Sequence, residues 1–204
     1  TSTLMFGLVT EEGDFSLIAV GDMTRPTRLL FGTGSTSGNS FSANALSYLG
    51  PNKQPVSLSG TIVDQVSITG SYSLTGESAT FTLDYANLYE RAASFGTLAG
   101  VYTLTVPANG TNPGTVLTVD VGATGAFTYT NSASGCTITG SFTVPHSNRN
   151  YYRFTGTPAG CTAAGTSVSG MAYLGDNSAG QNRVLTMLGQ DQTQTAPIFF
   201  VLPK

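Results

Sequence analysis

The sequence has little charge. Charged residues make up 9% of the 204 positions and the formal net charge is −3, whereas about 25% is usual for soluble domains. There is no run of like charges and no basic stripe interleaved with aromatic residues, so nucleic acid is not expected as a partner. No apolar stretch approaches the roughly 20 residues that a membrane-spanning helix needs.

Tryptophan is absent, and cysteine and histidine are scarce. The cysteines are Cys136 and Cys161 and the one histidine is His146, which excludes an ordinary Cys/His zinc site. Calcium loops, nucleotide-binding glycine loops and a Gly-x-Ser-x-Gly nucleophile elbow are also missing. We therefore expect no metal, no other cofactor and no enzymatic activity.

The two cysteines are predicted to form a disulfide. The segment between them is typical of a hairpin, with strands at residues 137–144 and 151–157 and a turn about Asn148 and Arg149. The apolar positions of this hairpin require a register one residue away from that of the cysteines, so we expect a bulge near residues 156–158. A disulfide indicates an oxidising compartment outside the cytosol.

The sequence is rich in apolar residues that alternate with polar ones, and turn residues separate these stretches. This pattern is typical of β-strands. Strands are predicted at residues 4–9, 15–20, 28–32, 40–48, 56–63, 65–74 and 79–85, and at 101–106, 116–121, 126–131, 137–144, 151–157, 167–174, 183–188 and 197–202. Their regular spacing predicts an all-β protein of antiparallel sheets, arranged as barrels or sandwiches.

One stretch, residues 87–95, lacks alternation and is rich in helix formers. We interpret it as a short helical segment that joins two β-units. The predicted domains are an N-terminal antiparallel β-domain, residues 1–92, and a C-terminal domain, residues 93–204. The C-terminal domain is expected to be an eight-stranded up-and-down barrel.

A short motif of hydroxyl, aliphatic, hydroxyl and glycine recurs at residues 57–60, 67–70, 137–140 and 167–170. On a strand, the aliphatic residue and the glycine share one face and the hydroxyls share the other. Glycine on the inner face lets a strand coil sharply or accept a neighbouring aromatic ring. We interpret the motif as a cause of barrel curvature; close approach of the backbone to a ligand is the alternative.

The loop of the predicted hairpin is the candidate binding site. Loops on a rigid β-scaffold often carry function, and Tyr and Arg are enriched at binding hot spots. The candidate ligand-binding residues are His146, Asn148, Arg149, Asn150, Tyr151 and Arg153. The alternative is an ordinary polar hairpin with Tyr152 packed inward.

Several short segments between residues 89 and 174 carry a family resemblance. They are Tyr89-Glu90-Arg91, residues 98–102, residues 135–140, residues 150–152, Cys161 and residues 169–173. Together they resemble a group of Gram-negative envelope lipoproteins. The resemblance implies a lipid anchor upstream of this sequence and a location in the periplasm or at the cell surface, attached to the outer membrane. It implies no functional residue.

The predicted function is that of a non-enzymatic envelope lipoprotein or binding module. Hairpin loops would present residues to an unidentified protein or a glycan, and the membrane would be reached only through a lipid anchor outside this sequence. Two alternatives remain: a barrel that carries a small apolar ligand, because eight strands can enclose one, and a passive structural or assembly subunit.

Overall fold

The computed structural model describes residues 4–22, 25–50, 52–109, 113–161 and 165–204. The protein is all-β, with 67% strand and 4% helix. It consists of two compact units, residues 1–86 and 87–204. The division lies before the helical segment rather than after residue 92, because this segment bonds to the second unit: the Asn150 amide donates to the Tyr89 carbonyl over 2.9 Å.

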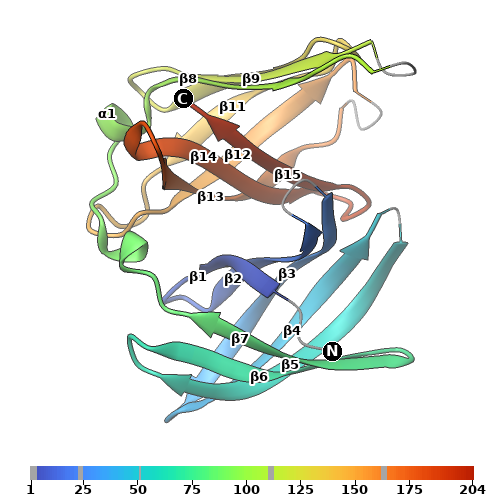
Figure 1. Cartoon of the computed structure of the whole chain (residues 1–204), viewed down its shortest axis with the longest axis vertical. Helices are drawn as coiled ribbons and strands as arrows, with labels where there is room; N and C mark the ends of the chain where they lie inside the picture. The colour runs from blue at the N-terminus through green and yellow to red at the C-terminus, as the bar shows by residue number, and fades with distance from the viewer. Residues whose placement is uncertain (1–3, 23–24, 51, 110–112, 162–164) are drawn as a thin grey trace. The chain divides into compact units, whose positions relative to one another are not determined.

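Unit 1 is one antiparallel sheet of seven strands that pair in sequence order (Figure 1). Its strands are β1 (Leu4–Val9), β2 (Asp14–Asp22), β3 (Arg25–Ser37), β4 (Ser40–Leu49), β5 (Asn52–Val63), β6 (Ser67–Leu74) and β7 (Glu77–Asp84). One face of the sheet is apolar, and its core includes Phe15, Leu30, Phe41, Leu58 and Tyr72. The opposite face also buries apolar residues on β2, β3 and β4, namely Ile18, Phe31 and Tyr48, so the sheet is apolar on more than one side.

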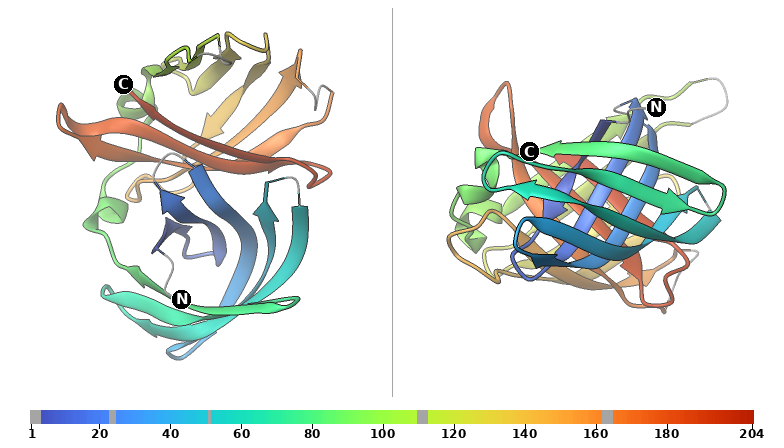
Figure 2. Two further views of the ribbon diagram at one scale, coloured as in Figure 1. Left: turned by 45° about the vertical axis from the view of Figure 1, so that its right-hand side comes forward. Right: turned by 90° about the horizontal axis from the view of Figure 1, so that it is seen from below.

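Unit 2 is a nearly closed barrel of eight antiparallel strands, also paired in sequence order (Figure 2). It begins with a 3₁₀-helix, η1 (Asn87–Glu90), and one turn of α-helix, α1 (Phe95–Leu98). Its strands are β8 (Gly100–Val106), β9 (Thr115–Val121), β10 (Ala126–Asn131), β11 (Thr137–Thr143), β12 (Tyr152–Ala159), β13 (Val168–Asn177), β14 (Gly180–Asp191) and β15 (Pro197–Pro203). The predicted all-β fold with an eight-stranded C-terminal barrel is confirmed.

Side chains occupy the interior of the barrel. Tyr102, Tyr152, Leu174 and Leu185 have no exposed surface, and the ring centroids of neighbouring aromatic residues, such as Phe127 and Phe142, lie 4.8–6.3 Å apart. Aromatic pairs at this separation add to the stability that burial provides. The interior is thus a packed core of the kind that period-two alternation predicts.

The glycines of the recurring motif face other glycines across neighbouring strands. Gly140 pairs with Gly156 and Gly170 pairs with Gly189. A Cβ atom on Gly140 would lie 2.0 Å from the carbonyl oxygen of Thr155 and 2.8 Å from the ring of Phe127. Such contacts are far inside van der Waals distance, so these positions require glycine. The interpretation that the motif permits close, curved strand packing is supported.

The disulfide between Cys136 and Cys161 is present, with a Cα–Cα distance of 4.6 Å. The expected bulge near residues 156–158 is wrong, because the ladder between β11 and β12 keeps one register as far as Ala159. The extra residue is accommodated beyond the ladder, at Gly160, whose φ of +67° turns the chain. The bridge therefore joins the ends of two regular strands.

A buried carboxylate fixes the turn between β14 and β15. Asp191 is 2% exposed. Its Oδ1 accepts the amides of Thr195 and Ala196, each over 2.6 Å, and its Oδ2 accepts the hydroxyls of Thr193 and Thr195. Burial raises the pKa of Asp191, but these hydrogen bonds stabilise the ionised form more and lower the pKa to about 2.

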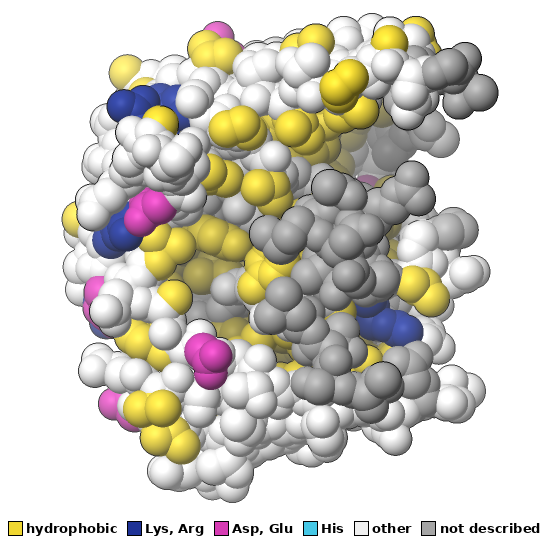
Figure 3. Space-filling model, in the orientation of Figure 1, with side chains coloured by type: hydrophobic (Ala, Val, Ile, Leu, Met, Phe, Trp, Pro, Cys, Tyr) yellow, Lys and Arg dark blue, Asp and Glu magenta, His cyan; other side chains and the backbone are white. Residues whose placement is uncertain are grey.

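The exposed side chains of the strands are mainly uncharged and polar. Figure 3 shows few charged side chains on the face it presents, in keeping with the composition. Among the described residues, no helix is long and apolar enough to cross a bilayer.

Substituting a paired glycine should destabilise the barrel. We expect Gly140→Ala to lower the free energy of unfolding by about 1–3 kcal/mol, the usual effect of overpacking. Gly122→Ala is the control, since its Cβ would meet only the Ala126 carbonyl oxygen at 3.6 Å; its effect should stay within about 0.5 kcal/mol. Urea denaturation measures both, and equal stability of the two variants would show that the close approach is unimportant.

The pKa of Asp191 predicts acid sensitivity. A carboxylate whose folded pKa lies below its ordinary value of 3.8 stabilises the fold above that value, and this contribution is lost as pH falls toward about 2. We expect a loss of about 2 kcal/mol from this group. Asp191→Asn should flatten the pH dependence of the free energy of unfolding in this window, whereas Asp120→Asn, which removes an exposed carboxylate, should leave it unchanged.

Candidate functional site

Of the residues predicted to bind a ligand, Asn150 is instead part of the interior. It is 2% exposed, and its Nδ2 donates to the carbonyl oxygens of Leu88, over 3.1 Å, and Leu174, over 2.7 Å. Its Oδ1 accepts the amide of Leu174 over 3.2 Å. Asn150 thus links the 3₁₀-helix η1 to strand β13, and both N–H donors of its side-chain amide are used within the protein.

Tyr151 and Arg149 also contact η1. The Tyr151 side chain is fully buried and stacks on Tyr89, with ring centroids 6.2 Å apart. Arg149 Nη1 donates to Glu90 Oε2 over 2.8 Å, and its guanidinium carbon lies 5.6 Å from the centre of the Tyr89 ring. These contacts hold η1 against the loop before β12.

A second ion pair fixes the same segment to the end of β13. Arg91 donates from both terminal nitrogens to the Asp176 carboxylate, over 2.5 and 2.6 Å. These hydrogen bonds from Arg91 lower the pKa of Asp176. The adjacent residues Glu90 and Arg91, at the end of η1, are therefore both held by ion pairs, which is a structural role.

The six predicted ligand-binding residues differ in how far they are exposed to solvent. His146 and Asn148 are exposed, Arg149 and Arg153 are half-buried, and Asn150 and Tyr151 are buried. Tyr152 packs inward, and its hydroxyl donates to the Ser94 carbonyl over 3.3 Å. Residues 146–153 thus mainly connect β12 to η1 and β13. Ligand binding remains a prediction for the exposed residues of this segment.

The larger polar feature lies on unit 1. On five adjacent strands, β3 to β7, three outward-facing positions each carry Ser, Thr or Asn, and every one of these side chains is exposed. We call this set the polar face. Its cross-strand rows are Thr33–Asn44–Ser57–Ser73–Ser78, Ser35–Ser42–Ser59–Ser71–Thr80 and Ser37–Ser40–Thr61–Thr69–Thr82.

The register fixes the spacing of the polar face. Neighbouring strands lie about 4.8 Å apart and successive outward residues on one strand about 6.7 Å apart. The face therefore presents donors and acceptors in a regular array without a charged or titratable group. Such an array cannot perform acid–base or nucleophilic chemistry of the usual kind, but it can hydrogen-bond a neutral ligand.

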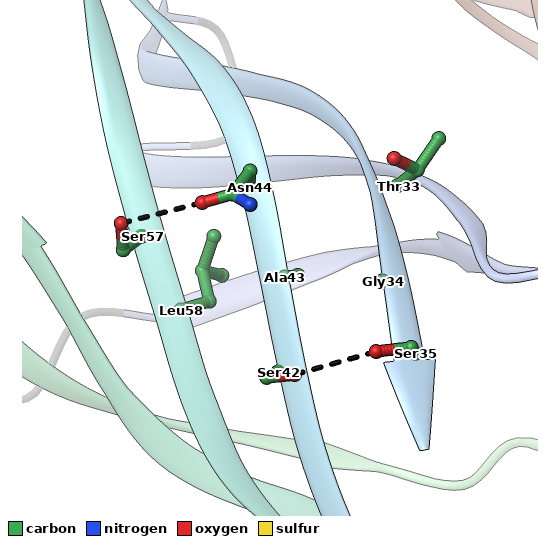
Figure 4. A pocket seen from close by; sticks show the side chains of 8 residues that line it. All are labelled: Thr33, Gly34, Ser35, Ser42, Ala43, Asn44, Ser57 and Leu58. Atoms are coloured by element: carbon green, nitrogen blue, oxygen red, sulfur yellow. Dashed lines mark hydrogen bonds between the residues drawn. The ribbon is translucent and has the colours of Figure 1, made fainter.

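A depression of about 380 Å³ opens on β3, β4 and β5 (Figure 4). Ser57 donates to Asn44 Oδ1 over 3.5 Å, and the hydroxyl oxygens of Ser35 and Ser42 lie 3.4 Å apart. These bonds are long and hence weak, so the groups can take other partners. Five of the residues that line the depression belong to the polar face: Thr33, Ser35, Ser42, Asn44 and Ser57.

The prediction of a binding loop overlooked the polar face, although its signal is present in the sequence. Ser57, Ser59 and Thr61 alternate with apolar residues or glycine, as do Thr69, Ser71 and Ser73. The recurring motif places these hydroxyls on one side of each strand. Only the cross-strand register shows that the hydroxyls of five strands form one surface.

The described part of the chain contains no cluster of three His, Cys, Asp or Glu residues that could hold a metal ion. Comparison of the chain with known protein families, with curated proteins and with solved structures finds no match. What the polar face can bind is therefore inferred from the side chains that form it.

Substitutions in the loop should separate structural from surface residues. Tyr151→Ala removes a fully buried aromatic side chain and should lower the free energy of unfolding by about 3–5 kcal/mol. His146→Ala and Asn148→Ala alter exposed residues and should each change it by less than about 0.5 kcal/mol. Thermal and urea denaturation measure these effects; a Tyr151→Ala variant as stable as the wild type would contradict the structural role.

Proposed function

We propose that this protein is a non-enzymatic binding module of the cell envelope that holds a neutral, hydroxyl-rich polymer, a polysaccharide, on the polar face of unit 1. One observation carries the proposal: five adjacent strands present only Ser, Thr and Asn in three consecutive cross-strand rows. A surface maintained only for solubility would ordinarily include Lys and Glu, which these positions lack.

The chemistry of the polar face matches that of a polyol. Each hydroxyl donates one hydrogen bond and accepts up to two, so either partner can fill either role along a chain of sugar units. Removing water from hydroxyls costs much less free energy than removing it from charges. Because no charge is involved, binding should depend little on ionic strength.

Two further features support a location outside the cytosol. The disulfide between Cys136 and Cys161 is of the kind that persists in oxidising compartments. The resemblance of residues 89–174 to envelope lipoproteins adds attachment to the outer membrane through a lipid anchor. The filled interior of the barrel favours a surface ligand over a small molecule carried inside.

Affinity electrophoresis in gels containing a neutral polysaccharide tests the proposed function. A panel of soluble β-glucan, xylan, mannan and dextran should include at least one that slows the protein, to a similar extent at low and high salt. Ser59→Lys places a long charged side chain at the centre of the polar face and should weaken this retardation by at least about tenfold, or 1.4 kcal/mol.

The control is Thr139→Lys, which introduces the same charged side chain at an exposed position on β11 of unit 2. This variant should bind as the wild type does, after correction for its own mobility in a gel without polysaccharide. The proposal fails if no neutral polysaccharide retards the protein, or if both lysine variants lose retardation equally.

A further inference from the structure

The barrel of unit 2 has two strands with an open edge. In the part of the chain that the structure describes, β8 pairs only with β9, and β15 pairs only with β14. We call the line between β8 and β15 the seam. At one end the seam is closed by Lys204, whose Nζ donates to the Ala99 carbonyl over 2.5 Å and lies 5.3 Å from the centre of the Tyr102 ring.

Toward the other end the seam opens. Along the inward face of β8, the exposed fraction rises from 0% at Tyr102 to 36% at Leu104 and 37% at Val106. Along the inward face of β15, Leu202 is fully buried, whereas Phe200 and Ile198 are only partly buried. Phe200 stacks on Tyr129, with ring centroids 4.4 Å apart. Leu104 and Val106 point to the same interior as Tyr102, yet more than a third of their surface stays exposed.

The backbone groups of β8 that face the seam can be identified from the neighbouring ladder. Val116 bonds through both its amide and its carbonyl to Ser132, on the side away from β8. Thr105 lies opposite Val116, so its own amide and carbonyl point away from β9 and into the seam. By alternation, the same holds for Thr103 and Val101.

The matching groups of β15 follow in the same way. The Lys204 amide donates to the Arg183 carbonyl of the β14 side over 2.7 Å, so the even-numbered residues of β15 face β14 and the odd-numbered ones face the seam. Pro197 and Pro203 occupy the first and last odd positions and have no N–H to donate. The amides of Phe199 and Val201 are left as donors.

From these observations we infer that the seam accepts an extended peptide segment of a partner protein, which adds to the barrel as a further strand. An extended chain can continue the backbone hydrogen bonding of an open strand edge. The inward residues Leu104, Val106 and Phe200 require apolar side chains at alternate positions of that segment. Neither β8 nor β15 carries a charged residue, which suits an uncharged strand.

The surface view is consistent with this inference. Hydrophobic side chains gather in a row between the upper strands, β8 and β9, and β15 (Figure 3). Exposed strand edges with apolar neighbours are sites at which other chains pair. The seam belongs to unit 2 alone and is independent of the polar face, so either proposal can fail without the other.

A peptide-binding measurement tests the inference. The probe is a fluorescent peptide of alternating Val and Thr with a Gly-Lys pair at each end, and fluorescence anisotropy measures its affinity. We expect binding, with the amides of Thr103, Phe199 and Val201 exchanging rapidly in the free protein and at least about tenfold more slowly in the complex. The same peptide N-methylated at its threonines should not bind, because it lacks one row of donors.

The variant Val201→Pro removes one seam-facing donor at an edge position where proline is tolerated. It should weaken peptide binding by at least about tenfold, whereas Val201→Thr, which keeps the amide, should bind like the wild type. Thr103→Pro repeats the test on the opposite edge, and unchanged melting temperatures show that these variants fold.

Four results would overturn the inference. They are no binding of the probe, equal binding by the proline and threonine variants, slow exchange of the seam amides in the free protein, and a dimer that Val201→Pro dissociates. Slow exchange would mean that β8 and β15 pair with each other. A dimer, detected by sedimentation, would mean that a second copy of the chain occupies the seam.

Discussion

The structure depends on how closely neighbouring strands can approach where glycine faces glycine. At Gly140 and Gly156, and again at Gly170 and Gly189, no side chain separates the two backbones. An aromatic ring covers the space: Phe127 lies against the first pair and Phe154 against Gly189. This lets a sheet of eight strands curve until its edges almost meet. Larger residues would hold the strands apart and flatten the sheet, and the core would lose its enclosure.

The polar face is the other consequence of the same alternation. Once the apolar residues and glycines of β3 to β7 are committed to the inner side, every second residue must face outward. In most proteins these positions mix charges with hydroxyls. Here a shared register aligns short neutral side chains from Thr33 to Thr82 into rows, and the low charge of the composition becomes a property of one surface. A ligand that contacts this surface meets hydrogen-bonding groups and no ion.

Much of the fold could be predicted from the sequence because its signals are local. Alternation and turn residues located the strands, and the two cysteines were paired correctly. The binding loop was predicted less well, since the partners of Asn150 lie 62 and 24 positions away, at Leu88 and Leu174. The sequence of an Asn-Tyr-Tyr stretch after a turn does not show whether its side chains face solvent or are buried against a distant segment. Likewise, alternation identifies outward hydroxyls on a single strand but does not show which strands are neighbours.

The seam shows most clearly that local sequence pattern predicts the direction of a side chain but not its burial. Leu104 and Val106 alternate with threonines just as Tyr102 does, so the sequence predicts the same inward environment for all three. Their burial depends on whether β15, almost a hundred residues later in the chain, lies beside them, and it does so only at the end held by Lys204. Prolines at both ends of β15 limit the donors that this edge offers, which discourages indiscriminate pairing yet leaves Phe199 and Val201 able to bond. An edge that is restricted in this way, but still apolar along its inner side, is consistent with the selective strand pairing that we infer.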